Sequence, residues 1–283
     1  MSLEPARFQL EAEMVFDGWV GGGSGAEPVL LLHGFPQTAR AMLPVAQELV
    51  AAHLRVVVPD QRGYSRDARP LDVAEYSIEL LVGDALGLLD AAGIDQVHLV
   101  GHDWGALVAW TLAANAPGRV KSLTAISVPH PAAFGRALQG DLDQQQRSAY
   151  LQLFQAPNGV AEQVLLAHDA AKLRAMYGPE VPAEAVGEYV ARLSEPGALS
   201  AALSWYRALS PAQLLVVPPV SVPTTFVWGA GDVAIGRVAA TACAEFVSGD
   251  YDFVELPDQG HWLPEAATAE VVGAISRRIA AAA

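Results

Sequence analysis

The chain has 283 residues and a mass of 29.8 kDa, which is long enough for one α/β domain with an inserted subdomain. Its net charge of −14 and pI near 4.8 argue against nucleic acid or an anionic membrane as a partner. The single cysteine, Cys243, excludes an internal disulfide and a cysteine-based metal site. The acidic N-terminal segment is not typical of a signal peptide, and no apolar run is long enough for a membrane span, so we expect a cytoplasmic protein.

Short apolar runs typical of strands alternate with longer Ala- and Leu-rich stretches typical of helices. Apolar runs without alternation favour a parallel sheet that is buried on both faces, and the layout predicts a doubly wound α/β fold. The predicted strands are 29–32, 56–59, 97–100, 123–128, 225–228 and 252–256, and the predicted helices are 41–52, 78–92, 106–115 and 266–283. The glycine cluster at residues 21–25 predicts a hairpin loop, since no helix pattern follows it as a phosphate-binding loop would require.

The alternation of strands and helices is interrupted in the second half of the chain. It stops after about Pro131 and resumes near Pro223, and the stretch between is helical in composition. We therefore expect an all-helical cap over residues 132–217, inserted into a core domain made of residues 1–131 and 218–283. Prolines at the exit of the insertion are typical of a chain that leaves one layer for the next strand.

The strongest local motif is VHLVGHDWGALVAW, which runs from a predicted strand through Asp103 into a predicted helix. Glycines stand two residues before and two residues after Asp103, in the G-x-nucleophile-x-G pattern of a sharp strand-to-helix turn. Such a turn is crowded and projects the side chain of its central residue into a cleft. The projected side chain here is a carboxylate.

Three further motifs follow predicted strands in an order that fits catalysis. HGFPQ includes His33, Phe35 and Pro36, GAGD ends in Asp232, and GHW begins just before His261. Each motif alone has a structural explanation, because an Asp in a βα loop is often a helix N-cap and a lone His often packs in a core. Their joint occurrence, in the order nucleophile, acid, histidine, predicts a catalytic set.

With these motifs, the chain resembles the α/β-hydrolase superfamily over essentially its whole length. Within that superfamily it is most similar to the epoxide hydrolases and haloalkane dehalogenases, which use an aspartate nucleophile. RGYS at residues 62–65 and SVPHP at residues 127–131 also resemble segments of that family. The resemblance implies an α/β-hydrolase fold with a mostly parallel sheet, flanking helices and a helical lid.

The resemblance also implies a mechanism. An aspartate suits displacement at an sp³ carbon, which leaves an alkyl ester on Asp103. His261, oriented by Asp232, would then activate water, and the backbone N–H groups of Phe35 and Trp104 would bind the oxyanion. This chemistry needs neither a metal nor an organic cofactor.

The lid segments around Tyr150 and Tyr206 are similar to those that carry the two ring-opening tyrosines of epoxide hydrolases. Phenols stay protonated at neutral pH and can donate a hydrogen bond to an epoxide oxygen. Haloalkane dehalogenases usually have Asn or a carboxylate where this chain has Phe35, and fluoroacetate dehalogenases have arginine where it has Trp104. We therefore expect an epoxide hydrolase; the alternatives are a haloalkane dehalogenase and a non-catalytic homologue that binds a small ligand.

Aromatic side chains predict an apolar pocket for a small epoxide, with water as the second substrate. We expect substrate-binding roles for His33, Pro36, Phe154 and Trp205, although Phe154 and Trp205 could equally form the core of the lid. The natural substrate stays open at this stage, as does the formation of a homodimer.

Overall fold

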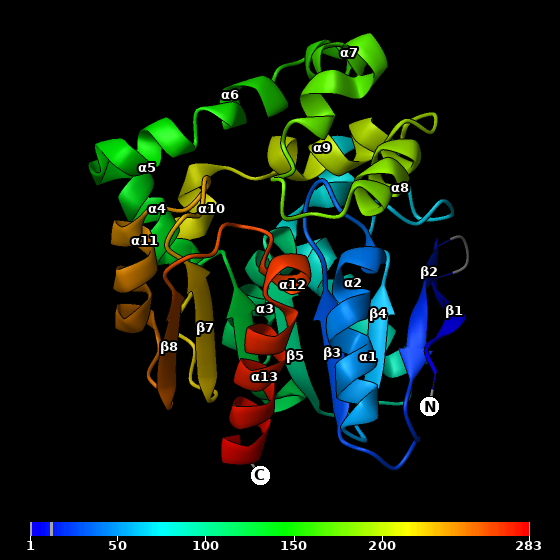
Figure 1. Cartoon of the computed structure of the whole chain (residues 1–283), viewed down its shortest axis with the longest axis vertical. Coiled ribbons are helices and arrows are strands. Elements are labelled where there is room, and N and C mark those ends of the chain that lie inside the picture. The colour runs from blue at the N-terminus through cyan, green and yellow to red at the C-terminus, as the bar shows by residue number, and fades with distance from the viewer. Residues whose placement is uncertain (1, 12–13, 283) are drawn as a thin grey trace.

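The computed structural model describes residues 2–11 and 14–282, which form one eight-stranded sheet flanked by helices (Figure 1). The strand order is β1-β2-β4-β3-β5-β6-β7-β8. Strand β2 runs antiparallel to β1 and β4, and the other neighbours are parallel. The strands are β1 Glu4–Glu11, β2 Met14–Gly21, β3 Pro28–Leu32, β4 Arg55–Pro59, β5 Val97–His102, β6 Val120–Ile126, β7 Thr224–Gly229 and β8 Tyr251–Leu256. The prediction of an α/β fold with a mostly parallel sheet is confirmed.

The N-terminal strands depart from the sequence-based predictions. Strands β1 and β2 were not predicted, because β2 is only partly buried and its apolar residues do not form a continuous run. The prediction of a hairpin at residues 21–25 is wrong. Gly21 pairs with Val56, and Pro28 pairs with Arg55, so β4 lies between β2 and β3 and the glycine cluster connects strands that are not neighbours.

Helices cover both faces of the sheet (Figure 1). Helices α1 (Leu43–Ala51) and α13 (Thr268–Ala282) pack on one face, and α2 (Ile78–Ala91) and α3 (Trp104–Asn115) pack on the other. Successive residues of β3 alternate between the two apolar clusters, as the two-residue period of a strand requires. This two-sided burial explains why β3 is a continuous apolar run.

Seven helices lie above the carboxyl edge of the sheet, at the top of Figure 1. They are α4 Pro131–Gly140, α5 Leu142–Arg147, α6 Tyr150–Phe154, α7 Val160–Arg174, α8 Ala183–Leu193, α9 Ala198–Ala208 and α10 Pro211–Leu215. Short helices α11 (Arg237–Ala242) and α12 (Leu263–Ala266) follow β7 and β8, and single 3₁₀ turns occur at 39–42, 73–76, 117–119 and 243–246. That residues 132–217 form a separate cap subdomain stays a prediction.

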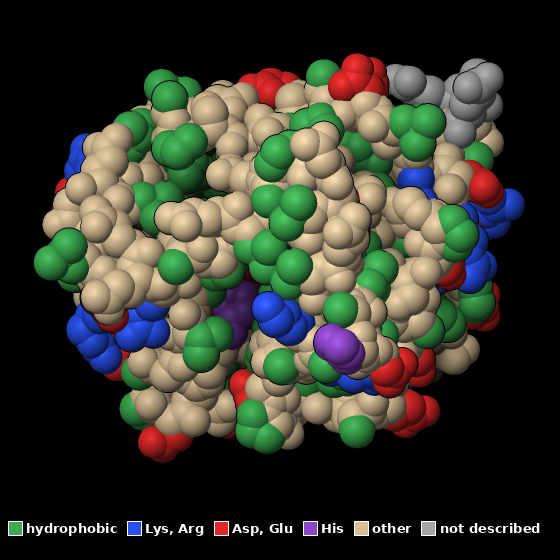
Figure 2. Space-filling view, turned by 90° about the horizontal axis from the view of Figure 1, so that it is seen from above, with side chains coloured by type: hydrophobic (Ala, Val, Ile, Leu, Met, Phe, Trp, Pro, Cys, Tyr) green, Lys and Arg blue, Asp and Glu red, His purple; other side chains and the backbone are tan. Residues whose placement is uncertain are grey.

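The face of the molecule above the carboxyl edge of the sheet exposes many hydrophobic side chains, and charged side chains gather toward its edges (Figure 2). The exposed apolar residues of the described chain include Leu142, Val216 and Val233. None of the helices in the described part of the chain is both long enough and apolar enough to cross a membrane.

Candidate active site

Asp103 lies at the sharp turn between β5 and α3. Its backbone has φ 54° and ψ −119°, a strained conformation for a residue with a side chain. A Cβ on Gly101 would lie 2.2 Å from the Gly105 carbonyl oxygen, and one on Gly105 would lie 2.2 Å from the Leu32 carbonyl oxygen. Glycine is therefore required on both sides, and the turn aims the Asp103 carboxylate away from the sheet.

The two carboxylate oxygens of Asp103 have different partners. The backbone N–H of Phe35, in the loop after β3, donates to Oδ1 at 2.8 Å. The Nε2 atom of His261 lies 3.5 Å from Oδ2. The pKa of Asp103, which is only 9% exposed, is lowered overall. Burial raises this pKa, but the hydrogen bond and charge of His261 outweigh burial, and the Trp104 backbone N–H also lowers it. Asp103 is therefore ionised at neutral pH.

His261 is held between Asp103 and a second carboxylate. Its Nδ1 lies 2.8 Å from Oδ2 of Asp232, which is fully buried. The other oxygen of Asp232 accepts hydrogen bonds from the backbone N–H groups of Ala234 at 2.7 Å and Ile235 at 2.9 Å. Burial lowers the pKa of His261, but the charges of Asp232 and Asp103 outweigh it and raise the pKa to about 10.

Two buried side chains that the sequence analysis did not single out fix the backbone of His261. Nε2 of His102 donates to the His261 carbonyl oxygen at 2.9 Å, and Oγ of Ser127 donates to the same oxygen at 2.7 Å. Burial lowers the pKa of His102 to about 4, so this ring is neutral. The sequence did offer a signal for this role of His102. It directly precedes Asp103, and its side chain must therefore point to the opposite side of the turn.

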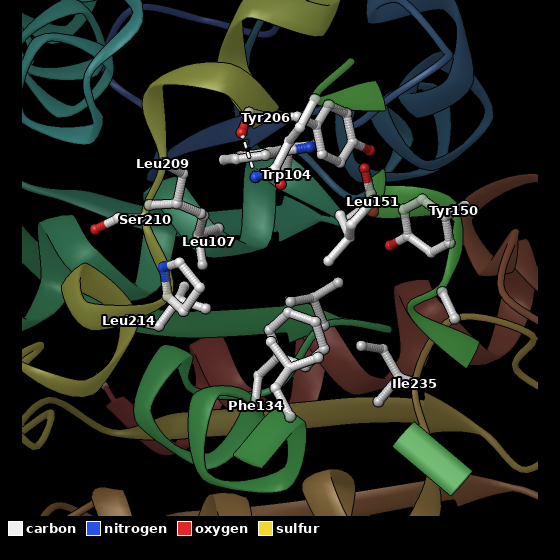
Figure 3. A pocket seen from close by; sticks show the side chains of 16 residues that line it. Trp104, Leu107, Phe134, Tyr150, Leu151, Tyr206, Leu209, Ser210, Leu214 and Ile235 are labelled. Atoms are coloured by element: carbon white, nitrogen blue, oxygen red, sulfur yellow. Dashed lines mark hydrogen bonds between the residues drawn. The ribbon is translucent and has the colours of Figure 1, made fainter. Parts of the chain in front are cut away.

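Tyr150 comes from α6 and Tyr206 from α9, and their rings lie 6.4 Å apart between centroids. Both rings line the cavity next to Asp103 (Figure 3). Burial is the main cause that raises the pKa of both phenols, and the charge of Asp103 adds to it. Both hydroxyls are therefore protonated at neutral pH.

Two cavities meet at Asp103, Tyr150, Tyr206 and Ala234. The first, of about 80 Å³, is apolar, and Figure 3 shows its side chains converging on a common space. We call it the apolar arm; it is lined further by Trp104, Leu107, Val128, Phe134, Leu138, Leu151, Gln155, Leu209, Ser210, Pro211, Leu214 and Ile235. The second, of about 520 Å³, is called the wide arm, and its wall includes Phe35, Phe154, Met176, Tyr177, Glu180, His261 and Trp262.

Only one of the four predicted substrate-binding residues lines these arms, namely Phe154. His33 is fully buried, and its Nε2 accepts from the Gln61 backbone N–H at 3.2 Å. Pro36 is buried, and its carbonyl oxygen accepts from the Tyr177 hydroxyl at 2.6 Å. Neither residue lines an arm, both hold the loop that carries Phe35, and a substrate-binding role for them stays a prediction.

Trp205 does not line either arm. It is 2% exposed, its Nε1 donates to the Arg62 carbonyl oxygen at 3.0 Å, and its ring packs edge-on against Trp104. It therefore lies behind the wall of the apolar arm, as the lid-core alternative expected. Sequence patterns did not identify Leu138, Leu151, Leu214 or Ile235 as cavity residues, because an apolar helix residue that faces a cavity has the same pattern as one that faces the core.

Comparisons with known proteins agree with this geometry. The family model described as "alpha/beta hydrolase fold" matches residues 27–267. The chain is 34% identical to the AB hydrolase superfamily protein YfhM of Bacillus subtilis, over 83% of this chain and 84% of that protein. It is 32% identical to Epoxide hydrolase A of Mycobacterium tuberculosis, over 90% of both chains.

Solved structures give the same result. A structure described as one of the novel epoxide hydrolases from metagenomes of hot environments superposes with a TM-score of 0.88, at 26% identity and 99% coverage of both chains. Epoxide Hydrolase A from Mycobacterium thermoresistibile superposes with a TM-score of 0.83, at 28% identity and 98% coverage of both. The predicted resemblance is confirmed: the chain belongs to the α/β-hydrolase family and is similar to its epoxide hydrolases.

Proposed function

We propose that this protein hydrolyses epoxides to vicinal diols through a covalent alkyl ester on Asp103. The observation that carries the proposal is the environment of that carboxylate: Oδ1 is bound by the Phe35 N–H, Oδ2 faces His261, and two tyrosines line the same space. Relatives of 32% and 26% identity that are named as epoxide hydrolases support it.

In the first half-reaction, an oxygen of the ionised Asp103 attacks a ring carbon of the epoxide, and the bond between that carbon and the ring oxygen breaks. The developing alkoxide needs a proton or strong hydrogen bonds. The protonated hydroxyls of Tyr150 and Tyr206 supply them from the cap side of the cavity. The product of this step is an ester between Asp103 and the opened substrate.

In the second half-reaction, His261 takes a proton from water, and the hydroxide attacks the carboxyl carbon of Asp103. Negative charge develops on the carbonyl oxygen of the ester, where the N–H groups of Phe35 and Trp104 form the oxyanion hole. The ester carries no charge on Asp103, so the pKa of His261 falls from its value in the free protein and the imidazole becomes available as a base. Asp232 stabilises the imidazolium that forms. The tetrahedral intermediate then collapses: the bond between the carboxyl carbon and the substrate oxygen breaks, and Asp103 becomes a carboxylate again. The two protons of the attacking water, one of them held on His261, pass to the leaving alkoxide and to the tyrosine that donated in ring opening, and the diol leaves.

The substrate that fits this site is a small apolar epoxide. The apolar arm is lined mostly by Leu, Phe, Trp and Ile side chains and suits one hydrocarbon substituent, while the wide arm suits the other and the attacking water. The proposed cap, residues 132–217, contributes both tyrosines and most of the wall of the apolar arm.

The test is a panel of styrene oxide-like and aliphatic epoxides beside 1-haloalkanes, with diol and halide release followed for the wild type and Asp103→Asn. We expect diol from the epoxides and none from Asp103→Asn. Halide release without diol would make the protein a dehalogenase. If neither diol nor halide is released, and a His261→Gln variant gains no substrate-derived mass, the result would favour the non-catalytic homologue.

A further inference from the structure

One buried amide of the cap is bonded to the loop that carries Asp232. We define the acid loop as residues 232–236, after β7. Gln144 in α5 is fully buried, its Nε2 donates to the Ala234 carbonyl oxygen at 2.7 Å, and its Oε1 accepts from the Gly236 N–H at 2.8 Å. An amide that is satisfied on both its donor and acceptor sides fixes the orientation of the backbone it touches.

The acid loop and α5 approach each other closely. A Cβ on Gly236 would lie 2.8 Å from Oδ2 of Asp143 in α5, and the neighbouring Arg147 donates from its guanidinium to the Asp232 carbonyl oxygen. Three backbone groups of the loop, on Asp232, Ala234 and Gly236, are therefore bonded to a single turn of the cap.

The same loop backbone determines how Asp232 is oriented. The N–H groups of Ala234 and Ile235 hold Oδ1 of Asp232, which leaves Oδ2 for His261. Gln144 bonds to the peptide groups on both sides of Ile235. A loss of these bonds would let the loop rotate and move Oδ2 away from the imidazole.

Gln144 also touches the segment that leads to Tyr150. Its Nε2 makes a second hydrogen bond, to Oγ of Ser148 at 2.9 Å, and α6 begins at Tyr150 two residues later. One side chain thus connects the cap segment that carries a proton donor of the first half-reaction with the core loop that serves the second.

We propose that Gln144 is a positioning residue that couples the cap to the acid loop and keeps Asp232 aligned with His261. This inference rests on the function proposed for Asp232. Gln144 does not line either arm, so it acts on the reaction through the acid loop and Asp232.

The test compares Gln144→Leu, which keeps the side-chain volume but removes both polar atoms, with Gln145→Ala. Gln145 is exposed on the same helix and bonds only to carbonyl groups inside the cap. Rapid-quench experiments with an epoxide measure the two steps separately. We expect the rate of ester formation in Gln144→Leu to stay within about twofold of the wild type. The rate of ester hydrolysis should fall about tenfold or more, because the hydrogen bonds that orient Asp232 are lost. Gln145→Ala should match the wild type in both steps.

A second readout needs no substrate. NMR titration of the His261 imidazole should show a lower pKa in Gln144→Leu than in the wild type, because Asp232 no longer faces the ring, and no change in Gln145→Ala. If no epoxide is turned over, the proposed function fails, while this titration still decides the role of Gln144. If Gln144→Leu does not fold, Gln144→Asn keeps the amide but is one methylene shorter, so it loses at least one of the two bonds to the loop and should show a smaller shift. An unchanged His261 titration and unchanged ester hydrolysis, even with a lower melting temperature, would overturn the proposal.

Discussion

The carboxylate of Asp103 is shared between a backbone donor and an imidazole, and this asymmetry underlies both proposed half-reactions. Oδ1 is engaged by the Phe35 N–H at 2.8 Å, whereas the contact of Oδ2 with His261 is longer, at 3.5 Å. The oxygen with the fixed donor is already placed as the future oxyanion. The carboxylate thus needs little rearrangement between attack and hydrolysis.

Loss of either tyrosine hydroxyl should slow ring opening. We expect Tyr150→Phe and Tyr206→Phe each to lower kcat/KM for an epoxide by about 10²-fold, the usual contribution of a positioned proton donor. Tyr76→Phe is the matched control, because its hydroxyl bonds to the Pro70 carbonyl oxygen away from the site. Steady-state diol formation checks the prediction. Full activity in both single variants and in the double variant would mean that the tyrosines only pack the cap.

The pH dependence of ester hydrolysis should follow His261. In the free protein, burial lowers the pKa of His261 but Asp232 and Asp103 raise it to about 10. In the ester only Asp232 remains charged, so the pKa falls, and the neutral base that hydrolysis requires becomes populated as pH rises. We expect the decay rate of the ester to increase with pH and to level off below pH 10.

Quenched samples analysed by intact-protein mass spectrometry would measure that decay between pH 5 and pH 10. Asp232→Asn removes the second carboxylate and should shift the rise to lower pH while it slows the plateau rate. A decay rate that is flat or that falls as pH rises would contradict the role of His261 as the base.

At the scale of single elements, the strand-to-helix turn at Asp103 demands glycine for steric reasons. Gly105→Ala should lower the free energy of unfolding by about 2–3 kcal/mol or prevent folding, because its Cβ would lie 2.2 Å from a backbone oxygen of β3. Gly83→Ala is the control: Gly83 is inside α2 with open space around its Cβ position, and alanine there should add about 0.5–1 kcal/mol. Urea unfolding checks both, and equal effects of the two substitutions would contradict the steric argument.

The elements that the sequence predicted well are those in which a local pattern and burial agree. The inner parallel strands are buried on both faces and are rich in apolar residues, as at β7, where all six residues are buried. Strands β1 and β2 lie at one end of the sheet and are only partly buried, so they lack that pattern. Strand β2 pairs with β4, which begins more than thirty residues after β2 ends, and short-range periodicity carries no information about that pairing.

The same limit applies to the site. Asp103, Asp232 and His261 follow strands that end at one edge of the sheet, so their convergence could be predicted from motif order and topology. Gln144 and Glu265 could not be predicted, because their partners come from elements far apart in the chain. His33 and Pro36 were predicted to bind substrate, yet both are buried and neither lines either arm.

On the scale of the whole molecule, Glu265 joins three parts of the chain. Its carboxylate, in α12, accepts hydrogen bonds from the Tyr189 hydroxyl of α8 at 2.9 Å and from Nε2 of Gln37, in the loop after β3, at 2.5 Å. Burial raises the pKa of Glu265 to about 7, against the opposing effects of Tyr189, Arg40 and Gln37. The folded protein therefore binds a proton here more tightly than the unfolded chain.

This raised pKa makes stability depend on pH. Glu265 contributes stability that is fully present below pH 4.5, the ordinary value, and is lost as pH rises through about 7. In the wild type, ionisation of Glu265 should lower the free energy of unfolding by about 2–3 kcal/mol as pH rises from 4.5 through about 7. We expect this part of the decline to be absent in Glu265→Gln, because glutamine is uncharged throughout. Glu245→Gln, at an exposed ion pair with Arg136, is the control and should leave the pH profile unchanged. Superimposable profiles for Glu265→Gln and the wild type would contradict the prediction.

The central claim, an ester on Asp103, is tested most directly by a single turnover in ¹⁸O-labelled water with enzyme in excess over epoxide. Water attacks the carboxyl carbon in our account, so the oxygen delivered to the diol comes from Asp103. We predict that the first diol carries no label and that the peptide containing Asp103 gains one ¹⁸O atom. Labelled diol in the first turnover, with an unlabelled Asp103 peptide, would show that water attacks the epoxide directly and would contradict the account.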